Sequence, residues 1–300
     1  MTPERHTLRA GRLALEVLPA AGGSIARFDH LGDAGRQPLL CGTDEHYADV
    51  LESACFPLVP YANRIRGGRF QCDGREVRLA ANLPGDASPL HGQGWRAAWS
   101  VQSVAGDRID MVFRHDAGEW PWAYESRQRI ELSPEGCTIE LSCRNLSDRP
   151  MPCALGLHPY YPCTAQTLLD TGVSSVWTVD RDVLPVDKLP ATGRYSLQNR
   201  PICGQDLDNG FDGWSGQARI TWPGQPVALE LSSPDAAYFQ VYSPVGRGFF
   251  AAEPVQNANA ALNAPQDQWP ALGIELLAPG ESLQLRARFR VFESAVRAGG

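Results

Sequence analysis

Two titratable residues stand inside segments that are otherwise apolar, aromatic and rich in proline. His158 lies in Ala-Leu-Gly-Leu-His-Pro-Tyr-Tyr-Pro (154–162), and Glu253 lies in Phe-Phe-Ala-Ala-Glu-Pro-Val-Gln-Asn (249–257). Such surroundings exclude water and can shift a pKa toward the working pH. An imidazole and a carboxylate placed in this way are suited to acid–base chemistry on a small polar substrate.

Each of these residues also has a purely structural interpretation. His158 can be a hydrogen-bonded core histidine, although the prolines and tyrosines around it predict a rigid aromatic loop. Glu253 can face solvent at the end of a strand. The apolar run 249–252 before it reads as buried, and a carboxylate that ends a buried strand must face a partner or a cleft.

Three arginines precede a turn in the segment 60–70. Arg64 follows the apolar, proline-rich run 56–60, which favours partial burial with the guanidinium donors aimed at hydroxyl groups. Arg66 and Arg69 are better explained as solvated charges of a hairpin.

A histidine and two tryptophans form a second candidate cluster. His91 lies between Pro89 and the glycines at 92 and 94, which permit close backbone approach. The alternative is a loop histidine bonded to the backbone. Trp95 and Trp99 can offer a flat surface to a sugar ring.

Two acids, Asp208 and Asp212, stand among aromatic residues in the segment 207–214. Segments of this composition occur in turns and also in sugar-binding sites. Turn chemistry is the safer interpretation for at least one of the two.

The elements that must position these residues are strands. Residues 137–144 and 283–291 alternate between apolar and polar side chains, the period of a strand with one buried face. Turn residues at 73–74, 106–107, 134–136 and 223–225 separate paired runs. We expect one antiparallel all-β domain over residues 1–300, with the Pro- and Gly-rich segment 180–217 as an excursion over one rim.

Composition narrows the function classes. The net charge of −7 is made of scattered charges of both signs, so nucleic acid and membrane are not expected partners. No apolar run has the length of a signal peptide or membrane span, which predicts a cytoplasmic protein. The eight cysteines include no C-x-x-C pair, so free thiols are expected and zinc is not. No phosphate loop, dinucleotide fingerprint or metal-type histidine pair is present, so chemistry built on those motifs finds little support and no metal site is expected.

Five segments, in order along residues 60–260, resemble the aldose 1-epimerase (galactose mutarotase-like) family. They are Asn63-Arg64-Ile65, His91-Gly92, His158-Pro-Tyr, Leu207-Asp208-Asn-Gly-Phe211, and Val241-Tyr-Ser-Pro with the downstream Glu253. Each motif is weak alone, but their order makes the resemblance specific. It is closest to the bacterial branch with a His-Pro-Tyr segment. It departs from the better-known galactose mutarotases, which have an Asn-His-Ser-Tyr segment and a longer Glu-Thr-Gln segment.

The resemblance implies a β-supersandwich of large antiparallel sheets with few short helices and a cleft over one sheet. It implies interconversion of the α and β anomers of a free aldose without a cofactor. Glu253 would be the general base that removes the proton from the C1 hydroxyl, and His158 the general acid that protonates the ring oxygen. A nearby carboxylate, Glu253 or Asp208, is expected to hold the pKa of His158 up.

The resemblance also implies a set of residues that bind the sugar hydroxyls. These are Asn63, Arg64, His91 and Asp208, with Asp212 as a further candidate that aligns less well with the acid of the family.

Two alternatives stay open at this stage. One is a hexose-6-phosphate mutarotase in which Arg66 and Arg69 contact the phosphate. The other is a non-catalytic sugar-binding or sugar-sensing protein, although such a protein needs no acid–base pair. In each case the partner is a monosaccharide, and a monomer or a homodimer is expected.

Overall fold

The structure is a computed structural model that describes residues 4–33, 35–43 and 49–294, so the ends of the expected 1–300 domain lie outside the described residues. Strands dominate it, as the all-β prediction requires, and within these residues no helix is long and apolar enough to cross a membrane. The helical elements are three-residue 3-10 turns: η1 (Val50–Glu52), η2 (Arg66–Gly68), η3 (Gly94–Arg96), η4 (Gly193–Tyr195), η5 (Ala261–Asn263), η6 (Gln266–Gln268) and η7 (Pro270–Leu272).

The larger of two antiparallel sheets has eleven strands, and β4 (Gly35–Leu40) pairs with β3 beside the main path. The other ten strands lie in the order β1 (His6–Ala10), β2 (Leu13–Leu18), β3 (Ser24–Gly32), β5 (Cys55–Leu58), β13 (Gly156–Pro162), β22 (Phe249–Val255), β21 (Tyr238–Ser243), β18 (Leu207–Asp212), β15 (Ser175–Val179) and β16 (Pro185–Pro190).

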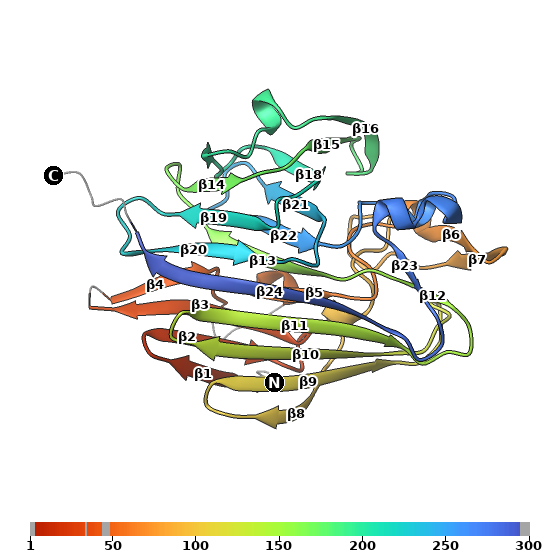
Figure 1. Cartoon of the computed structure of the whole chain (residues 1–300), viewed down its shortest axis with the longest axis horizontal. Helices are drawn as coiled ribbons and strands as arrows, with labels where there is room; N and C mark the ends of the chain where they lie inside the picture. Colours follow the sequence, from red (N-terminus) through yellow and green to blue (C-terminus); the bar gives the residue numbers. More distant parts are fainter. Residues whose placement is uncertain (1–3, 34, 44–48, 295–300) are drawn as a thin grey trace.

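The smaller sheet has nine strands, and the long strand β24 runs through its middle (Figure 1). The order is β17 (Arg200–Pro201), β14 (Leu168–Thr171), β19 (Gln217–Thr221), β20 (Val227–Ser232), β24 (Ser282–Glu293), β11 (Gly136–Asn145), β10 (Tyr124–Ser133), β9 (Arg108–His115) and β8 (Ser100–Val104). Two small two-stranded sheets complete the fold: β6 (Arg69–Cys72) with β7 (Arg75–Arg78), and β12 (Met151–Cys153) with β23 (Glu275–Leu277).

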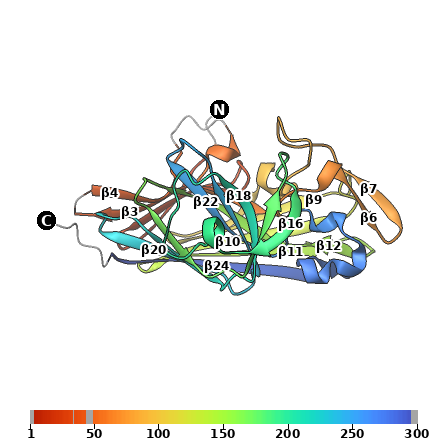
Figure 2. The same ribbon diagram turned by 90° about the horizontal axis from the view of Figure 1, so that it is seen from above.

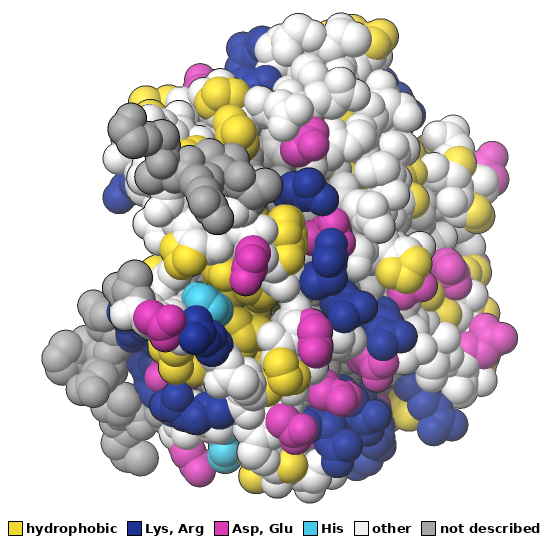
Figure 3. Space-filling model, turned by 60° about the vertical axis from the view of Figure 1, so that its left-hand side comes forward, with side chains coloured by type: hydrophobic (Ala, Val, Ile, Leu, Met, Phe, Trp, Pro, Cys, Tyr) yellow, Lys and Arg dark blue, Asp and Glu magenta, His cyan; other side chains and the backbone are white. Residues whose placement is uncertain are grey.

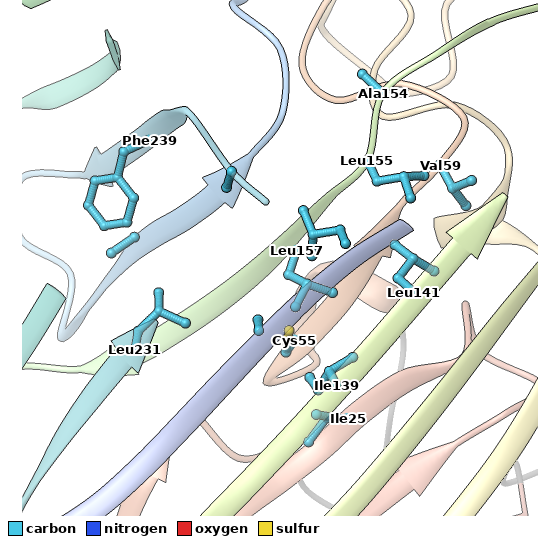
Figure 4. Packing of buried hydrophobic residues seen from close by; sticks show 14 of the residues in the cluster. Ile25, Cys55, Val59, Ile139, Leu141, Ala154, Leu155, Leu157, Leu231 and Phe239 are labelled. Carbon is cyan, nitrogen blue, oxygen red and sulfur yellow. The ribbon is translucent and has the colours of Figure 1, made fainter. Parts of the chain in front are cut away.

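The two large sheets lie one over the other, with β22 and β18 on one side of the core and β24 on the other (Figure 2). Because successive side chains of a strand point to opposite faces, each sheet turns one apolar face toward the other. Figure 4 shows this core, with Ile25, Cys55, Leu157 and Phe239 from the larger sheet and Ile139, Leu141 and Leu231 from the smaller one. The fold is the predicted galactose mutarotase-like supersandwich with few short helices.

The turns expected from the sequence join neighbouring strands. Asp73 and Gly74, with φ of 48° and 72°, link β6 to β7, as a type I′ turn requires. The turns at 106–107, 134–135 and 223–225 link β8 to β9, β10 to β11 and β19 to β20. Charged side chains of both signs are interspersed on the face seen in Figure 3, as the scattered charges of the sequence predict.

Two local expectations are wrong. The segment 154–162 is not a loop, because residues 156–162 form β13 in the interior of the larger sheet. The segment 180–217 is only partly a rim excursion. Its first part forms the edge strand β16, but residues 207–212 form β18 between β21 and β15.

The expectation of free thiols is also wrong for two cysteines. Cys163 and Cys203 form a disulfide with Cα atoms 5.6 Å apart. It joins the chain just after β13 to the segment just before β18, so only the tertiary fold brings the two thiols together. The other six cysteines are free, and five of them are buried.

Candidate active site

A pocket of about 330 Å³ opens on the face of the larger sheet that points away from the core. Strands β13, β22, β21 and β18, which are neighbours in this sheet, form its floor. The lining residues are Leu51, Asn63, Arg64, Leu83, Leu90, His91, Trp95, His158, Tyr160, Asp208, Gln240, Tyr242, Phe249 and Glu253. Each of the chain segments that the sequence marked for sugar chemistry therefore contributes at least one residue to one cavity.

Strand alternation explains why His158 faces this pocket. On β13, Leu157 and Tyr161 point into the core, so His158 and Tyr160 point to the opposite face. The register of β13 with β22 pairs residue 156 with 255 and residue 160 with 251. Residue 158 therefore stands across from residue 253, although the chain makes a long excursion between them.

The same alternation selects one face of each neighbouring strand. On β22, Phe250 and Ala252 join the core, which leaves Glu253 in the pocket. On β21, Gln240 pairs with Glu253 in the strand register and lies on its face of the sheet. Glu253 is therefore inside a strand that continues to Val255, rather than at the end of one.

His158 and Glu253 are in direct contact. The Nε2 atom of His158 lies 3.3 Å from Oε1 of Glu253, and their side chains are 9% and 2% exposed. Phe56 on β5 stacks on the imidazole with ring centroids 4.6 Å apart, which restrains the ring plane. The two residues which led the sequence analysis therefore face each other in the pocket.

Burial dominates the ionisation of this pair. It lowers the pKa of His158 to about 3 and raises the pKa of Glu253 well above its ordinary value, since each charged form loses its hydration. The negative charge of Asp208 raises the pKa of Glu253 further, and Arg64 lowers it. The expectation that carboxylates hold the pKa of His158 up is therefore wrong for this pocket. Both shifts favour the state in which the pair carries a single proton, on Glu253 rather than on His158.

This shared proton predicts a pH dependence of stability. Below pH 4.5 the unfolded chain binds a proton on both groups, whereas the folded pair stays singly protonated down to about pH 3. Stability falls wherever the unfolded state binds more protons as pH drops, so the pair costs about 2 kcal/mol of stability across this interval. Urea unfolding at pH 5.5 and pH 3.5 should show a larger loss for the wild type than for a His158→Gln/Glu253→Gln double variant. Equal losses in the two proteins would contradict the shared proton.

Arg64 is partly buried, as its apolar sequence context predicts. Its side chain is 13% exposed, and its Nε–H donates to Oδ2 of Asp86 at 2.8 Å. The backbone N–H of Arg64 donates to Oδ1 of Asn259 at 3.0 Å. Hydrogen bonds therefore hold both the backbone and the guanidinium group of Arg64.

Three asparagines hold the segment that carries Arg64. Asn257 exchanges hydrogen bonds with the backbone N–H and C=O of Ala62, and Asn263 does the same with Arg66. With Asn259 on Arg64, the asparagines contact every second residue of 62–66. The chain that follows the strand of Glu253 thus fixes the opposite wall of the pocket.

His91 has a defined tautomer. Its Nδ1 accepts a hydrogen bond from the backbone N–H of Asn63 at 3.1 Å, so the ring proton lies on Nε2. Burial and the nearby positive groups lower the pKa of His91 well below its ordinary value, so the ring stays neutral. Asn63 and His91 both adopt positive φ, 63° and 59°. This backbone strain is typical of functional sites.

Asp208 also lines the pocket, and a hydrogen bond ties it to β21. Its Oδ1 accepts a hydrogen bond from Nε2 of Gln240 at 2.9 Å. Burial raises the pKa of Asp208, while Arg64 and the Gln240 hydrogen bond act in the opposite direction. Among the described residues, no group of three or more His, Cys, Asp or Glu side chains is arranged to hold a metal ion.

Several sequence candidates lie elsewhere. Asp212 is outside the pocket lining and binds Nε1 of Trp177 at 2.7 Å and the Lys188 ammonium. Trp95 belongs to the pocket lining but is 0% exposed, and Trp99 lies outside the lining and is 3% exposed, so neither offers a free flat surface.

The two arginines considered for phosphate binding also lie outside the pocket lining. Arg66 contacts the carbonyl of Pro185 and lies 3.6 Å from Asp180, and Arg69 is exposed on β6.

Sequence reasoning missed Asp86 and Gln240. Gln240 alternates with the apolar residues at 239 and 241. Assigning residues 238–243 to a strand would therefore have predicted that Gln240 lies on the face opposite the core. Asp86 lies in a loop without periodicity, and no sequence signal connects it to Arg64.

Comparison with known proteins agrees with this geometry. The family model described as aldose 1-epimerase matches residues 4–290. The uncharacterized protein YphB of Escherichia coli K12 is 35% identical over 95% of this chain and 98% of its own length. A crystal structure from Escherichia coli K12, proposed to be an aldose 1-epimerase, matches 97% of this chain and 99% of its own with a TM-score of 0.88 and 31% identity.

A galactose mutarotase-like protein from Clostridium acetobutylicum shares the fold at 16% identity. Its TM-score is 0.85, and the match covers 96% of this chain and 95% of that protein. The extent of the family match and the identity to the Escherichia coli relative decide the assignment. This chain belongs to the aldose 1-epimerase family.

Proposed function

We propose that the protein is an aldose 1-epimerase that interconverts the α and β anomers of a free aldose. The observation that carries this proposal is the 3.3 Å contact between Nε2 of His158 and Oε1 of Glu253 in a buried pocket. In a pyranose, the anomeric hydroxyl oxygen and the ring oxygen are both bonded to C1. The two groups that exchange protons with these oxygens must therefore lie within a few ångströms of each other.

Glu253 removes the proton of the C1 hydroxyl, and His158 delivers a proton to the ring oxygen. The bond between C1 and the ring oxygen breaks, and an open-chain aldehyde forms. Rotation about the C1–C2 bond presents the other face of the aldehyde, and closure reverses both proton transfers. Moving the single shared proton from Oε1 to Nε2 creates the base and the acid together, without exchange with bulk water.

The rest of the lining supplies recognition. His91 presents its Nε2–H as a donor, and the carboxylate of Asp208 accepts hydrogen bonds from hydroxyls. The guanidinium of Arg64 donates hydrogen bonds to sugar hydroxyls from the pocket wall that the segment 62–66 forms. Tyr160 and Phe249 add aromatic surface, which suits the apolar C–H faces of a pyranose.

An unphosphorylated sugar fits the charges better than a hexose 6-phosphate. In the described lining Arg64 is the one permanent cation, and Asp86 already pairs with it. Asp208 and Glu253 add acidic groups to the same cavity. A phosphate dianion would meet the carboxylate of Asp208 and an arginine whose charge Asp86 already balances.

Polarimetry across a panel of D-glucose, D-galactose, D-xylose and L-arabinose, together with the 6-phosphates of the two hexoses, tests the proposal. We expect accelerated mutarotation of at least one free aldose and a smaller effect on the phosphorylated form. A preference for a 6-phosphate would favour the phosphate-specific alternative. Calorimetric binding of an aldose without acceleration would identify a sugar-binding protein instead.

A further inference from the structure

Asp86 lies behind the pocket wall rather than in the lining. Its Oδ2 accepts the hydrogen bond of Arg64 Nε at 2.8 Å, and its Oδ1 accepts one from the backbone N–H of Ser88 at 2.8 Å. The Asp86 and Arg64 side chains are only 14% and 13% exposed. Both carboxylate oxygens are therefore committed, and the loop that carries Asp86 fixes where the carboxylate stands.

The contact determines which donors of Arg64 remain for a ligand. An arginine side chain has many rotamers, and ordering it costs conformational entropy. Asp86 holds Nε, and Asn259 holds the backbone N–H, so the guanidinium is ordered before a ligand arrives. The terminal Nη groups, which carry four of the five guanidinium donors, stay available on the pocket side.

Asp86 also acts on the charge of the pocket. The positive charge of Arg64 lowers the pKa of both Glu253 and Asp208, whereas the negative charge of Asp86 raises the pKa of Asp208. Asp86 thus opposes the effect of Arg64 on the carboxyl group of Asp208, the acid that in turn raises the pKa of Glu253. A neutral polar residue at this position could order the guanidinium but could not supply this opposition.

We propose that Asp86 is a positioning residue that aims Arg64 at the sugar and offsets its charge. This inference rests on the proposed function, because Arg64 is taken to contact the sugar.

A double-mutant cycle tests the positioning. Asp86→Ala is expected to raise KM, and the Kd of the same aldose in calorimetry, by about tenfold while kcat changes less, because a disordered Arg64 must be ordered on binding. In an Arg64→Ala background, Asp86→Ala is expected to change neither quantity further. An equal rise in both backgrounds would overturn the proposal, since Asp86 would then act independently of Arg64.

Asp86→Asn tests the charge separately from the position. The amide oxygen of asparagine can still accept from Arg64 Nε, so KM should change less than in Asp86→Ala. The pocket becomes more positive, so the alkaline limb of the kcat/KM profile, where the shared proton is lost, should move to lower pH. A limb that does not move would refute the charge offset.

The groups that face Glu253 bear on this readout. In the pocket they are His158 and Tyr160 on β13, Asp208 on β18 and Arg64 on the adjoining wall. Tyr161 on β13 and Cys55 on β5 lie on the core side of the same sheet, within electrostatic range of Glu253. None of them differs between the wild type and Asp86→Asn, so a shift of the limb reports the charge at residue 86.

Asp110→Asn is a matched control. Asp110 on β9 accepts a hydrogen bond from Nε of Arg129 at 2.6 Å, in a pair like that of Asp86 and Arg64 but on the other large sheet. The control should keep wild-type KM and pH profile. Should the wild type bind D-galactose or D-glucose without accelerating mutarotation, the proposed function fails, and the Kd cycle still decides whether Asp86 acts through Arg64.

Discussion

The Glu253→Gln variant is expected to lose about 10²- to 10⁴-fold in kcat/KM for mutarotation, the usual contribution of one general base. Glutamine keeps the volume of the side chain and its place on β22, but its amide cannot take the proton of the C1 hydroxyl. Because the loss belongs to the transition state, kcat should fall while the Kd of the sugar changes little. Polarimetry and calorimetry on the same preparation measure the two effects.

The variant should remain folded. A neutral amide replaces a carboxyl group whose pKa is already raised by burial, so little charge is removed from the interior. Glu230→Gln is a suitable control, because Glu230 is paired with Arg290 on the other large sheet. A near-wild-type rate for Glu253→Gln would remove this residue from the mechanism.

His158→Gln is expected to produce a loss of similar size for the opposite reason. The ring oxygen would leave without receiving a proton, so ring opening slows by about 10²- to 10⁴-fold. Glutamine reaches about as far as Nε2, but its amide does not deliver a proton. Stopped-flow or polarimetric rates at several pH values provide the measurement.

A double variant shows whether the two residues work as a unit. With both replaced, the rate should fall little below that of either single variant, because one shared proton serves both steps. His115→Gln changes a histidine on β9 of the other large sheet, outside the pocket lining, and should leave the rate unchanged. Losses that multiply in the double variant would show that the two groups act separately.

Much of the fold was predictable because strand alternation is a local signal. The pattern of residues 137–144 alone indicates which face of β11 is buried, and Asp73-Gly74 alone indicates a turn. The proximity of His158 and Glu253 was different. It depends on the register between β13 and β22. Local sequence patterns do not predict this register, and only the family resemblance linked the two residues.

Other features were hidden because tertiary structure overrides local signals. Pro159 lacks a backbone donor and normally argues against an interior strand, yet it lies within β13. Cys163 and Cys203 meet only because two strands of one sheet bring their flanking segments together. Asp212 shares its strand face with Asp208, but its contacts with Lys188 and Trp177 lie outside the pocket lining.

The asparagine contacts have a consequence for how the protein is made. Ala62 and Arg64 emerge early from the ribosome, whereas Asn257 and Asn259, which hold them, follow 195 residues later. Strand β24 likewise inserts between β20 and β11, both of which are synthesised before it. Contacts of such long sequence separation fold slowly, so the nascent chain carries unpaired strand edges until synthesis is nearly finished. The pocket wall that carries Arg64 is therefore completed only after the segment 257–263 has been synthesised.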